Sequence, residues 1–198
     1  MISVKTQFDP IFTSISTRQC SWFCYQAIDN KKQLIDYFND NDIENFCKIY
    51  DLCLLRSSLN KKWSKDRHLI ETLFHKNILE KHHKNMTFYK MSYCIGGEDN
   101  YSSMPYSNTL EVLQTKKSFP ELSEYELKIK LDSMEKYDII MFNRFIMSYT
   151  LIKNDINFLL IDSHINICFE MDIDEIINYI NNNNTTEENI VTVVFENK

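Results

Sequence analysis

The chain has 198 residues and a formal net charge of −6 at pH 7, with 43% hydrophobic and 25% charged residues. This size and composition are typical of one globular domain with a substantial core, and the acidic balance argues against a surface that binds nucleic-acid phosphates. Because the sequence has neither an apolar run of 18 residues nor a signal peptide's apolar stretch, we expect no membrane span and a cytoplasmic location.

Helical patterns dominate the first part of the chain. Apolar residues recur at helical spacing over 19–29, and good N-cap residues stand just before that segment. The pattern continues over 31–55, with a break or cap expected at Asp40-Asn41-Asp42, and a further helix is predicted over 66–84.

The middle of the chain is the least regular part. Residues 86–109 contain both glycines of the sequence and a Tyr/Met/Ser mixture, with a short strand expected near Phe88–Tyr93. We therefore predict a single domain over 1–198, with a divergent insertion or long loop around 86–109 that is a candidate for function.

Strand patterns dominate the end of the chain. The elements expected there are a short helix over 108–117, a helix over 122–136 capped by Ser123, strands over Asp138–Leu151, Ile156–Asp162 and Ile165–Met171, a turn at Lys153-Asn154-Asp155, a helix over 173–181 and a strand over Ile190–Phe195. Helices that precede a mostly antiparallel sheet indicate an α+β fold.

The six cysteines (positions 20, 24, 47, 53, 94 and 168) form no C-x-x-C pair. We expect free thiols in a reducing compartment, no metal site and no cofactor. With only Gly96 and Gly97 in the chain, Gly-rich phosphate-binding loops are excluded.

Two distant motifs together suggest a nucleophilic site. Cys20 stands at the predicted start of a helix, a position that favours the reactive thiolate. Asp162 and His164 are two residues apart at the end of a predicted strand, so their side chains project from one face with Cα atoms roughly 6.5–7 Å apart. The carboxylate would then orient the imidazole, whose other nitrogen is left for Cys20.

Each of these signals also has an ordinary structural interpretation. A cysteine near a helix start is commonly a small core residue, and Asp and Ser are common in turns after strands. Other constellations are weaker. Cys24 lies one turn into the helix, and Cys168 is about 13 Å from His164 on an extended segment.

The motifs resemble a known family, the deubiquitinases at the N-terminus of herpesvirus large tegument proteins, which belong to the papain-like cysteine proteases. The matching stretches are Gln7-Phe8-Asp9, Gln19-Cys20-Ser21-Trp22 and Leu160-Ile161-Asp162-Ser163-His164. The resemblance implies a papain-like α+β fold in which Cys20 is the nucleophile and His164 the general base and acid. It also implies that Asp162 orients His164 and that the Gln7 amide donates to the oxyanion hole.

The resemblance implies a deubiquitinase that hydrolyses the peptide or isopeptide bond after the C-terminal glycine of ubiquitin. Its partners would be ubiquitin or polyubiquitin chains, in the cytoplasm or in a host's cytosol. From the composition we expect no nucleic-acid or membrane partner. The sequence does not give the oligomeric state, for which a monomer is the expectation. Two alternatives stay open: a papain-like peptidase or acyltransferase on another substrate, and a non-catalytic ubiquitin-binding domain.

Overall fold

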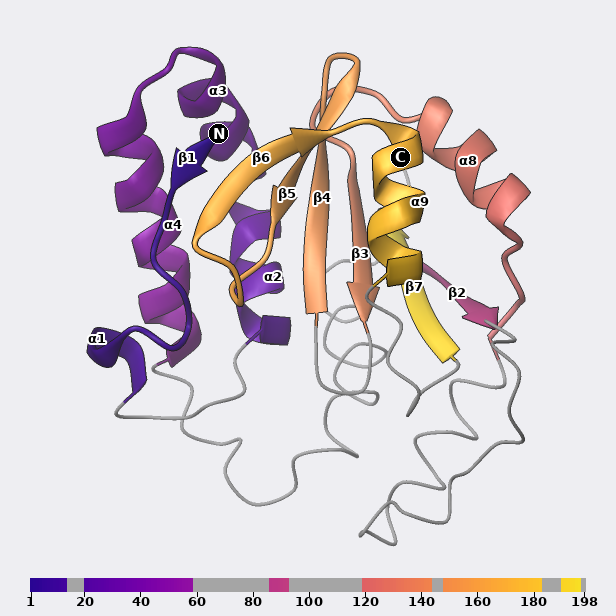
Figure 1. Cartoon of the computed structure of the whole chain (residues 1–198), viewed down its shortest axis with the longest axis horizontal. Helices are drawn as coiled ribbons and strands as arrows, with labels where there is room; N and C mark the ends of the chain where they lie inside the picture. The colour runs from indigo at the N-terminus through magenta and orange to yellow at the C-terminus, as the bar shows by residue number, and fades with distance from the viewer. Residues whose placement is uncertain (14–19, 59–85, 93–118, 144–147, 183–189, 197–198) are drawn as a thin grey trace, which may run out of the picture.

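A single antiparallel sheet runs through the centre of the molecule (Figure 1). The computed structural model describes residues 1–13, 20–58, 86–92, 119–143, 148–182 and 190–196. Within these ranges, seven strands lie side by side in the order β1-β6-β5-β4-β3-β7-β2, and every neighbouring pair is antiparallel. The strands are β1 (Ile2–Ser3), β2 (Met86–Ser92), β3 (Ile139–Asn143), β4 (Ser148–Asn154), β5 (Asn157–Ile161), β6 (Ile167–Met171) and β7 (Ile190–Glu196).

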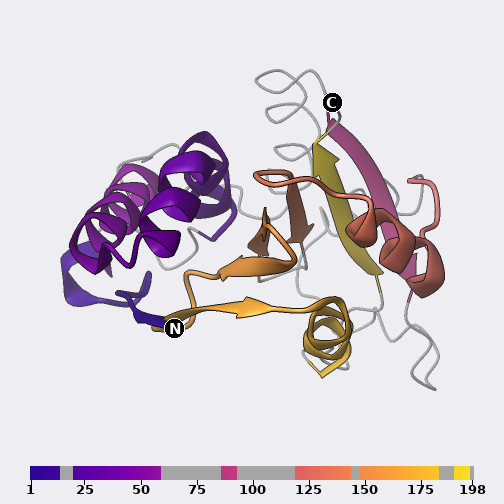
Figure 2. The same ribbon diagram turned by 90° about the horizontal axis from the view of Figure 1, so that it is seen from above.

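Helices cover both faces of this sheet (Figure 2). Helices from the first part of the chain pack on one face, and α8 and α9 pack on the other. The described helices are α1 (Pro10–Thr13), α2 (Cys20–Asp29), α3 (Lys31–Asn39), α4 (Ile43–Ser58), α8 (Glu124–Asp132) and α9 (Ile173–Asn182). The predicted α+β class, a helical N-terminal half packed on a mostly antiparallel sheet, is confirmed.

Strand β5 shows how the sequence supplies two cores at once. Leu159 and Ile161 pack into the core that includes residues of α2, α3 and α4, whereas Phe158 and Leu160 pack into the core that includes residues of α8 and α9. Successive side chains of a strand point to opposite faces, so a strand covered on both faces needs apolar residues at consecutive positions. This requirement explains the unbroken Phe-Leu-Leu-Ile run just before Asp162.

The break predicted at Asp40-Asn41-Asp42 separates α3 from α4. Asn41 has a φ of 53°, in the left-handed region that Asn tolerates better than most residues, and this conformation ends the helical path. The predicted helix over 19–29 corresponds to α2. The predicted helices over 66–84 and 108–117 lie outside the described residues.

Two of the predicted strand boundaries are wrong. The segment Asp138–Leu151 contains two strands, β3 and β4, which pair with each other through partners such as Ile140 and Leu151. The turn predicted at Lys153-Asn154-Asp155 also lies further on, because β4 continues to Asn154 and Asp155 is the first residue after it, with a φ of 47°. The first error arises because residues 138–151 have no Gly or Pro to mark where the chain reverses, and the second arises because the strand continues into the turn-favouring residues.

The start of the segment 86–109 is a regular strand. Strand β2 pairs with β7 along its whole length, from Met86 opposite Glu196 to Ser92 opposite Ile190. The strand expected near Phe88–Tyr93 is therefore present and begins two residues earlier. Residues 93–109 lie outside the described ranges. None of the described helices is long and apolar enough to cross a bilayer.

Candidate active site

Asp162 and His164 form a hydrogen-bonded pair in the turn that follows β5. One oxygen of Asp162, Oδ1, lies 2.7 Å from the ring nitrogen Nδ1 of His164 and accepts the backbone N–H of His164 at 2.9 Å. The turn is closed by the Ile165 N–H, which donates to the Asp162 carbonyl at 3.4 Å. The predicted pairing is present, but its expected origin on one strand face is wrong, because β5 ends at Ile161 and the Asp162 side chain bonds within a turn.

The Asp162 residue is held from both faces of the sheet. Tyr179 of α9 donates its hydroxyl to the second carboxylate oxygen at 2.9 Å, and Tyr50 of α4 donates to the Asp162 carbonyl at 3.0 Å. The Asp162 side chain is fully buried, so the Tyr179 hydroxyl takes the place of water beside its carboxylate, and the Tyr50 hydroxyl satisfies the backbone carbonyl. Neither tyrosine was predicted from the sequence, since their spacing from Asp162 carries no recognisable signal.

Cys20 is the first residue of α2, and it forms a hydrogen bond with His164 (the start of α2 and the β5–β6 turn lie close together in Figure 1). Burial of the His164 ring lowers its pKa, but the hydrogen bonds and charges of Asp162 and Cys20 outweigh this effect and raise the pKa to about 10. His164 is therefore an imidazolium at neutral pH. Cys20, His164 and Asp162 form one hydrogen-bonded chain in the structure.

Gln7 lies beside the same turn and is buried. Its backbone N–H donates to the Ser163 carbonyl at 2.8 Å, and its side-chain Oε1 accepts the Ser163 hydroxyl at 3.0 Å. The next residue, Phe8, is half exposed, and its ring centroid lies 5.8 Å from that of His164. All four residues singled out from the sequence are thus near this turn, while Ser163 and Phe8 are additional neighbours.

This arrangement has the parts of a thiol-based acyl-transfer site. A cysteine hydrogen-bonded to an imidazolium can act as a thiolate nucleophile, and the imidazolium can then donate its proton to a leaving amine. The first backbone N–H groups of a helix such as α2 have no intrahelical acceptor and can stabilise an oxyanion. A glutamine amide nearby can add one more donor.

The order and packing of these elements resemble those of a solved structure. That structure is the ubiquitin-specific protease encoded by murine cytomegalovirus tegument protein M48, in complex with a ubiquitin-based suicide substrate. The likeness has a TM-score of 0.53 at 8% sequence identity and covers 98% of this chain and 83% of the protease chain. The chain has a fold similar to that of a viral ubiquitin-specific protease. No family model and no curated protein matches the sequence.

At 8% identity, the likeness to the M48 protease concerns the fold and carries no residue's role with it. It is consistent with the α+β fold that the resemblance implied. The roles of Cys20, His164, Asp162 and Gln7 stay predictions, which the geometry around the β5–β6 turn makes testable.

Two further cysteines of the sequence analysis are packed inside the protein. Cys24 and Cys168 are fully buried, and burial raises the pKa of both thiols. A neutral buried thiol is a poor nucleophile, in keeping with their interpretation as packing residues. Across the described ranges, no three His, Cys, Asp or Glu side chains cluster in a way that could hold a metal ion.

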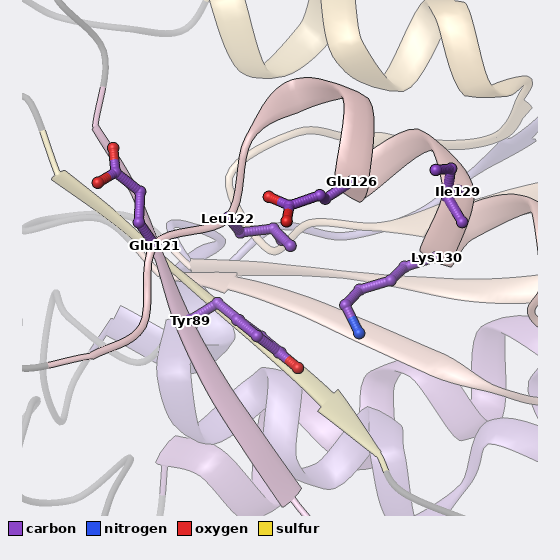
Figure 3. A pocket seen from close by; sticks show the side chains of 6 residues that line it. All are labelled: Tyr89, Glu121, Leu122, Glu126, Ile129 and Lys130. Atoms are coloured by element: carbon purple, nitrogen blue, oxygen red, sulfur yellow. The ribbon is translucent and has the colours of Figure 1, made fainter.

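A separate hollow of about 350 Å³ lies between β2 and α8, and none of the predicted catalytic residues lines it (Figure 3). Two of its charged groups already have partners in the fold. Glu126 accepts the backbone N–H and hydroxyl of Ser123, and the Lys130 amine lies 4.8 Å from the centroid of the Tyr89 ring. These contacts favour a structural origin for the hollow.

Proposed function

We propose that the protein is a cysteine-dependent deubiquitinase that hydrolyses the peptide or isopeptide bond after the C-terminal glycine of ubiquitin. The observation that carries this proposal is the hydrogen-bonded chain Cys20–His164–Asp162, set in a fold similar to that of the M48 protease. Its substrates would be ubiquitin conjugates or polyubiquitin chains, met in the cytoplasm or a host's cytosol, where the thiol stays reduced.

In this mechanism the Cys20 thiolate attacks the carbonyl carbon of the terminal glycine and forms a tetrahedral oxyanion. The His164 imidazolium donates its proton to the leaving amine as the C–N bond breaks, which leaves a thioester on Cys20. Neutral His164 then takes a proton from water, and the hydroxide attacks the thioester to release ubiquitin. Asp162 holds the imidazole orientation, and Gln7 donates its amide to the oxyanion.

The deciding experiment uses ubiquitin with a C-terminal electrophile as a covalent probe. We expect an adduct with the wild-type protein that Cys20→Ala abolishes. Cys47→Ala is the matched control, because Cys47 is a partly exposed thiol on α4. We expect it to label like the wild type.

Other outcomes point to the alternatives. An adduct that persists in Cys20→Ala would move the nucleophile to another residue. Ubiquitin binding without an adduct would favour a non-catalytic ubiquitin-binding domain. Reaction of Cys20 with a small thiol-directed electrophile, but not with the ubiquitin probe, would favour a papain-like peptidase or acyltransferase on another substrate.

Turnover of a ubiquitin substrate tests the remaining roles. We expect His164→Ala to eliminate turnover, Asp162→Ala to weaken it and Gln7→Ala to lower kcat by about 10²–10³-fold. Gln7→Glu keeps the length of the side chain and an acceptor for Ser163 but removes the amide donor, so it should lose about as much as Gln7→Ala. Unchanged turnover in either Gln7 variant would remove Gln7 from the site.

A further inference from the structure

Gln7 and Ser163 are joined by two hydrogen bonds of opposite direction. The Gln7 backbone N–H donates to the Ser163 carbonyl at 2.8 Å, and the Ser163 hydroxyl donates to Gln7 Oε1 at 3.0 Å. Gln7 is 2% exposed and Ser163 is 0% exposed, so water does not compete for this pair. The first bond fixes the Gln7 backbone beside the turn, and the second engages the side-chain amide.

The second bond matters because a glutamine amide has two ends of nearly equal shape and opposite hydrogen-bonding character. Only the Nε2 end can donate to an oxyanion, and a rotation of 180° would present Oε1 instead. Across the part of the chain that the structure describes, the Ser163 hydroxyl makes no other hydrogen bond. A rotated amide would leave the buried hydroxyl proton without an acceptor, which disfavours that orientation.

We propose that Ser163 is a positioning residue of the reaction, which holds the Gln7 amide with Oε1 toward Ser163 and Nε2 available as the oxyanion donor. This inference rests on the proposed function. Ser163 stands between Asp162 and His164, so one three-residue turn orients both the imidazole and the oxyanion donor. Within the described ranges, no acceptor is bonded to Gln7 Nε2, which leaves that donor for the substrate.

The kinetic test is a double-mutant cycle on the full chain with a ubiquitin C-terminal coumarin amide as substrate. We expect Ser163→Ala to lower kcat about 10-fold, the equivalent of one lost hydrogen bond, with KM unchanged within about two-fold. In a Gln7→Ala background the same substitution should change kcat by less than about two-fold, because the amide it positions is gone.

Two controls separate positioning from general loss of structure. Ser58→Ala removes another buried serine hydroxyl, which donates to the Leu55 carbonyl, and should leave kcat unchanged. Ser163→Cys keeps a small side chain with a weaker donor, so its kcat should fall between those of the wild type and Ser163→Ala. The pH above which kcat/KM falls, the alkaline limit of activity, should be the same in every Ser163 variant as in the wild type, since this hydroxyl contacts neither His164 nor Asp162.

The side-chain amide of Gln7 gives a readout that needs no substrate. In ¹⁵N-labelled protein we expect an ordered Gln7 amide in the wild type and a lower order parameter in Ser163→Ala and Ser163→Cys. Equal order parameters, a kcat within two-fold of wild type in Ser163→Ala, or losses that multiply in the double mutant would each overturn the inference. A wild-type protein that does not hydrolyse the substrate overturns the proposed function and the catalytic role with it, while the amide readout still decides whether Ser163 holds Gln7.

Discussion

At the scale of single residues, His164 is the group whose charge state controls the proposed reaction. Its pKa of about 10 lies above the ordinary value of 6.5 because the bonds to Asp162 and Cys20 outweigh the opposing effect of burial. The imidazolium therefore persists through neutral pH and is lost as pH rises through about 10. The stability that these interactions contribute is fully present below about pH 6.5. It is lost as pH rises from there through about 10.

We predict that Asp162→Asn moves the alkaline limit of activity toward neutral pH. The asparagine side chain can still accept the His164 backbone N–H and can donate to the Tyr179 hydroxyl. It lacks the negative charge of Asp162, which raises the His164 pKa. The limit near pH 10 should fall by about one unit or more, and kcat/KM measured from pH 6 to pH 11 reports it.

Asp132→Asn is the control for that profile, because Asp132 is an exposed carboxylate at the end of α8. Its alkaline limit should match that of the wild type. An unchanged limit in Asp162→Asn would contradict the assignment of this limit to the Asp162–His164 pair.

The sequence predicted the residues of this pair but not what surrounds them. Asp-x-His two residues apart is a local pattern, so it can be read from one strand end. Tyr50 and Tyr179 lie 112 and 17 residues from Asp162, and they reach it only because α4 and α9 pack on opposite faces of the sheet. No periodicity in the sequence encodes such a meeting.

At the scale of elements, the start of α8 is a feature that the sequence predicted correctly: Ser123 caps the helix. Ser123 is the N-cap, and its hydroxyl accepts the Glu126 backbone N–H at 3.2 Å. In the opposite direction, the Glu126 carboxylate accepts the Ser123 backbone N–H at 2.8 Å. The bond from the Ser123 backbone is the main reason why the pKa of Glu126 is lowered. Both partners lie within four residues, which is why the cap was predictable.

We predict that Ser123→Ala lowers the free energy of unfolding by about 1 kcal/mol, because the backbone N–H at the third helical position, that of Glu126, loses its side-chain acceptor. Urea denaturation measures the change. Turnover of the ubiquitin substrate should stay at the wild-type level, since α8 contributes no residue to the candidate active site.

Tyr125→Phe is the control on the same helix, because the Tyr125 side chain is 74% exposed and should tolerate the change. Equal stabilities of Ser123→Ala and the wild type would contradict the capping role. A loss of turnover without a loss of stability would instead link α8 to the site.

The strand boundaries were less predictable than the cap. β3 and β4 were predicted as one strand because apolar and β-branched residues continue through the region without Gly or Pro. A chain reversal without those residues has no local marker. Its position depends on pairing with neighbouring strands, and those partners are distant in sequence.

At the scale of the whole molecule, the sheet joins segments from both ends of the chain. β1 pairs with β6, and β2 pairs with β7, so contacts of high sequence separation set both edges. The order of predicted elements indicated an α+β fold, yet it did not indicate that helices cover both faces. The unbroken apolar runs of β3 and β5 contain that information, because a sheet with one face in water would alternate apolar and polar residues.

Burial on both faces predicts the response of two adjacent residues in β5. Leu159 packs with the core of α2, α3 and α4, Leu160 packs with the core of α8 and α9, and both side chains are 0% exposed. Leu159→Ala and Leu160→Ala should each lower the free energy of unfolding by about 2–5 kcal/mol, through lost burial and a residual cavity. Urea denaturation of the two variants measures both values.

The comparison within the pair decides whether the sheet is covered on both sides in solution. Ile156→Ala, in the turn before β5, is the control, because Ile156 is 86% exposed and should change stability by less than about 0.5 kcal/mol. If only one of the two leucine variants were destabilised, the face of the other leucine would be open to water. Asp162 would then lose one of its two tyrosine supports, because Tyr50 and Tyr179 come from helices on opposite faces.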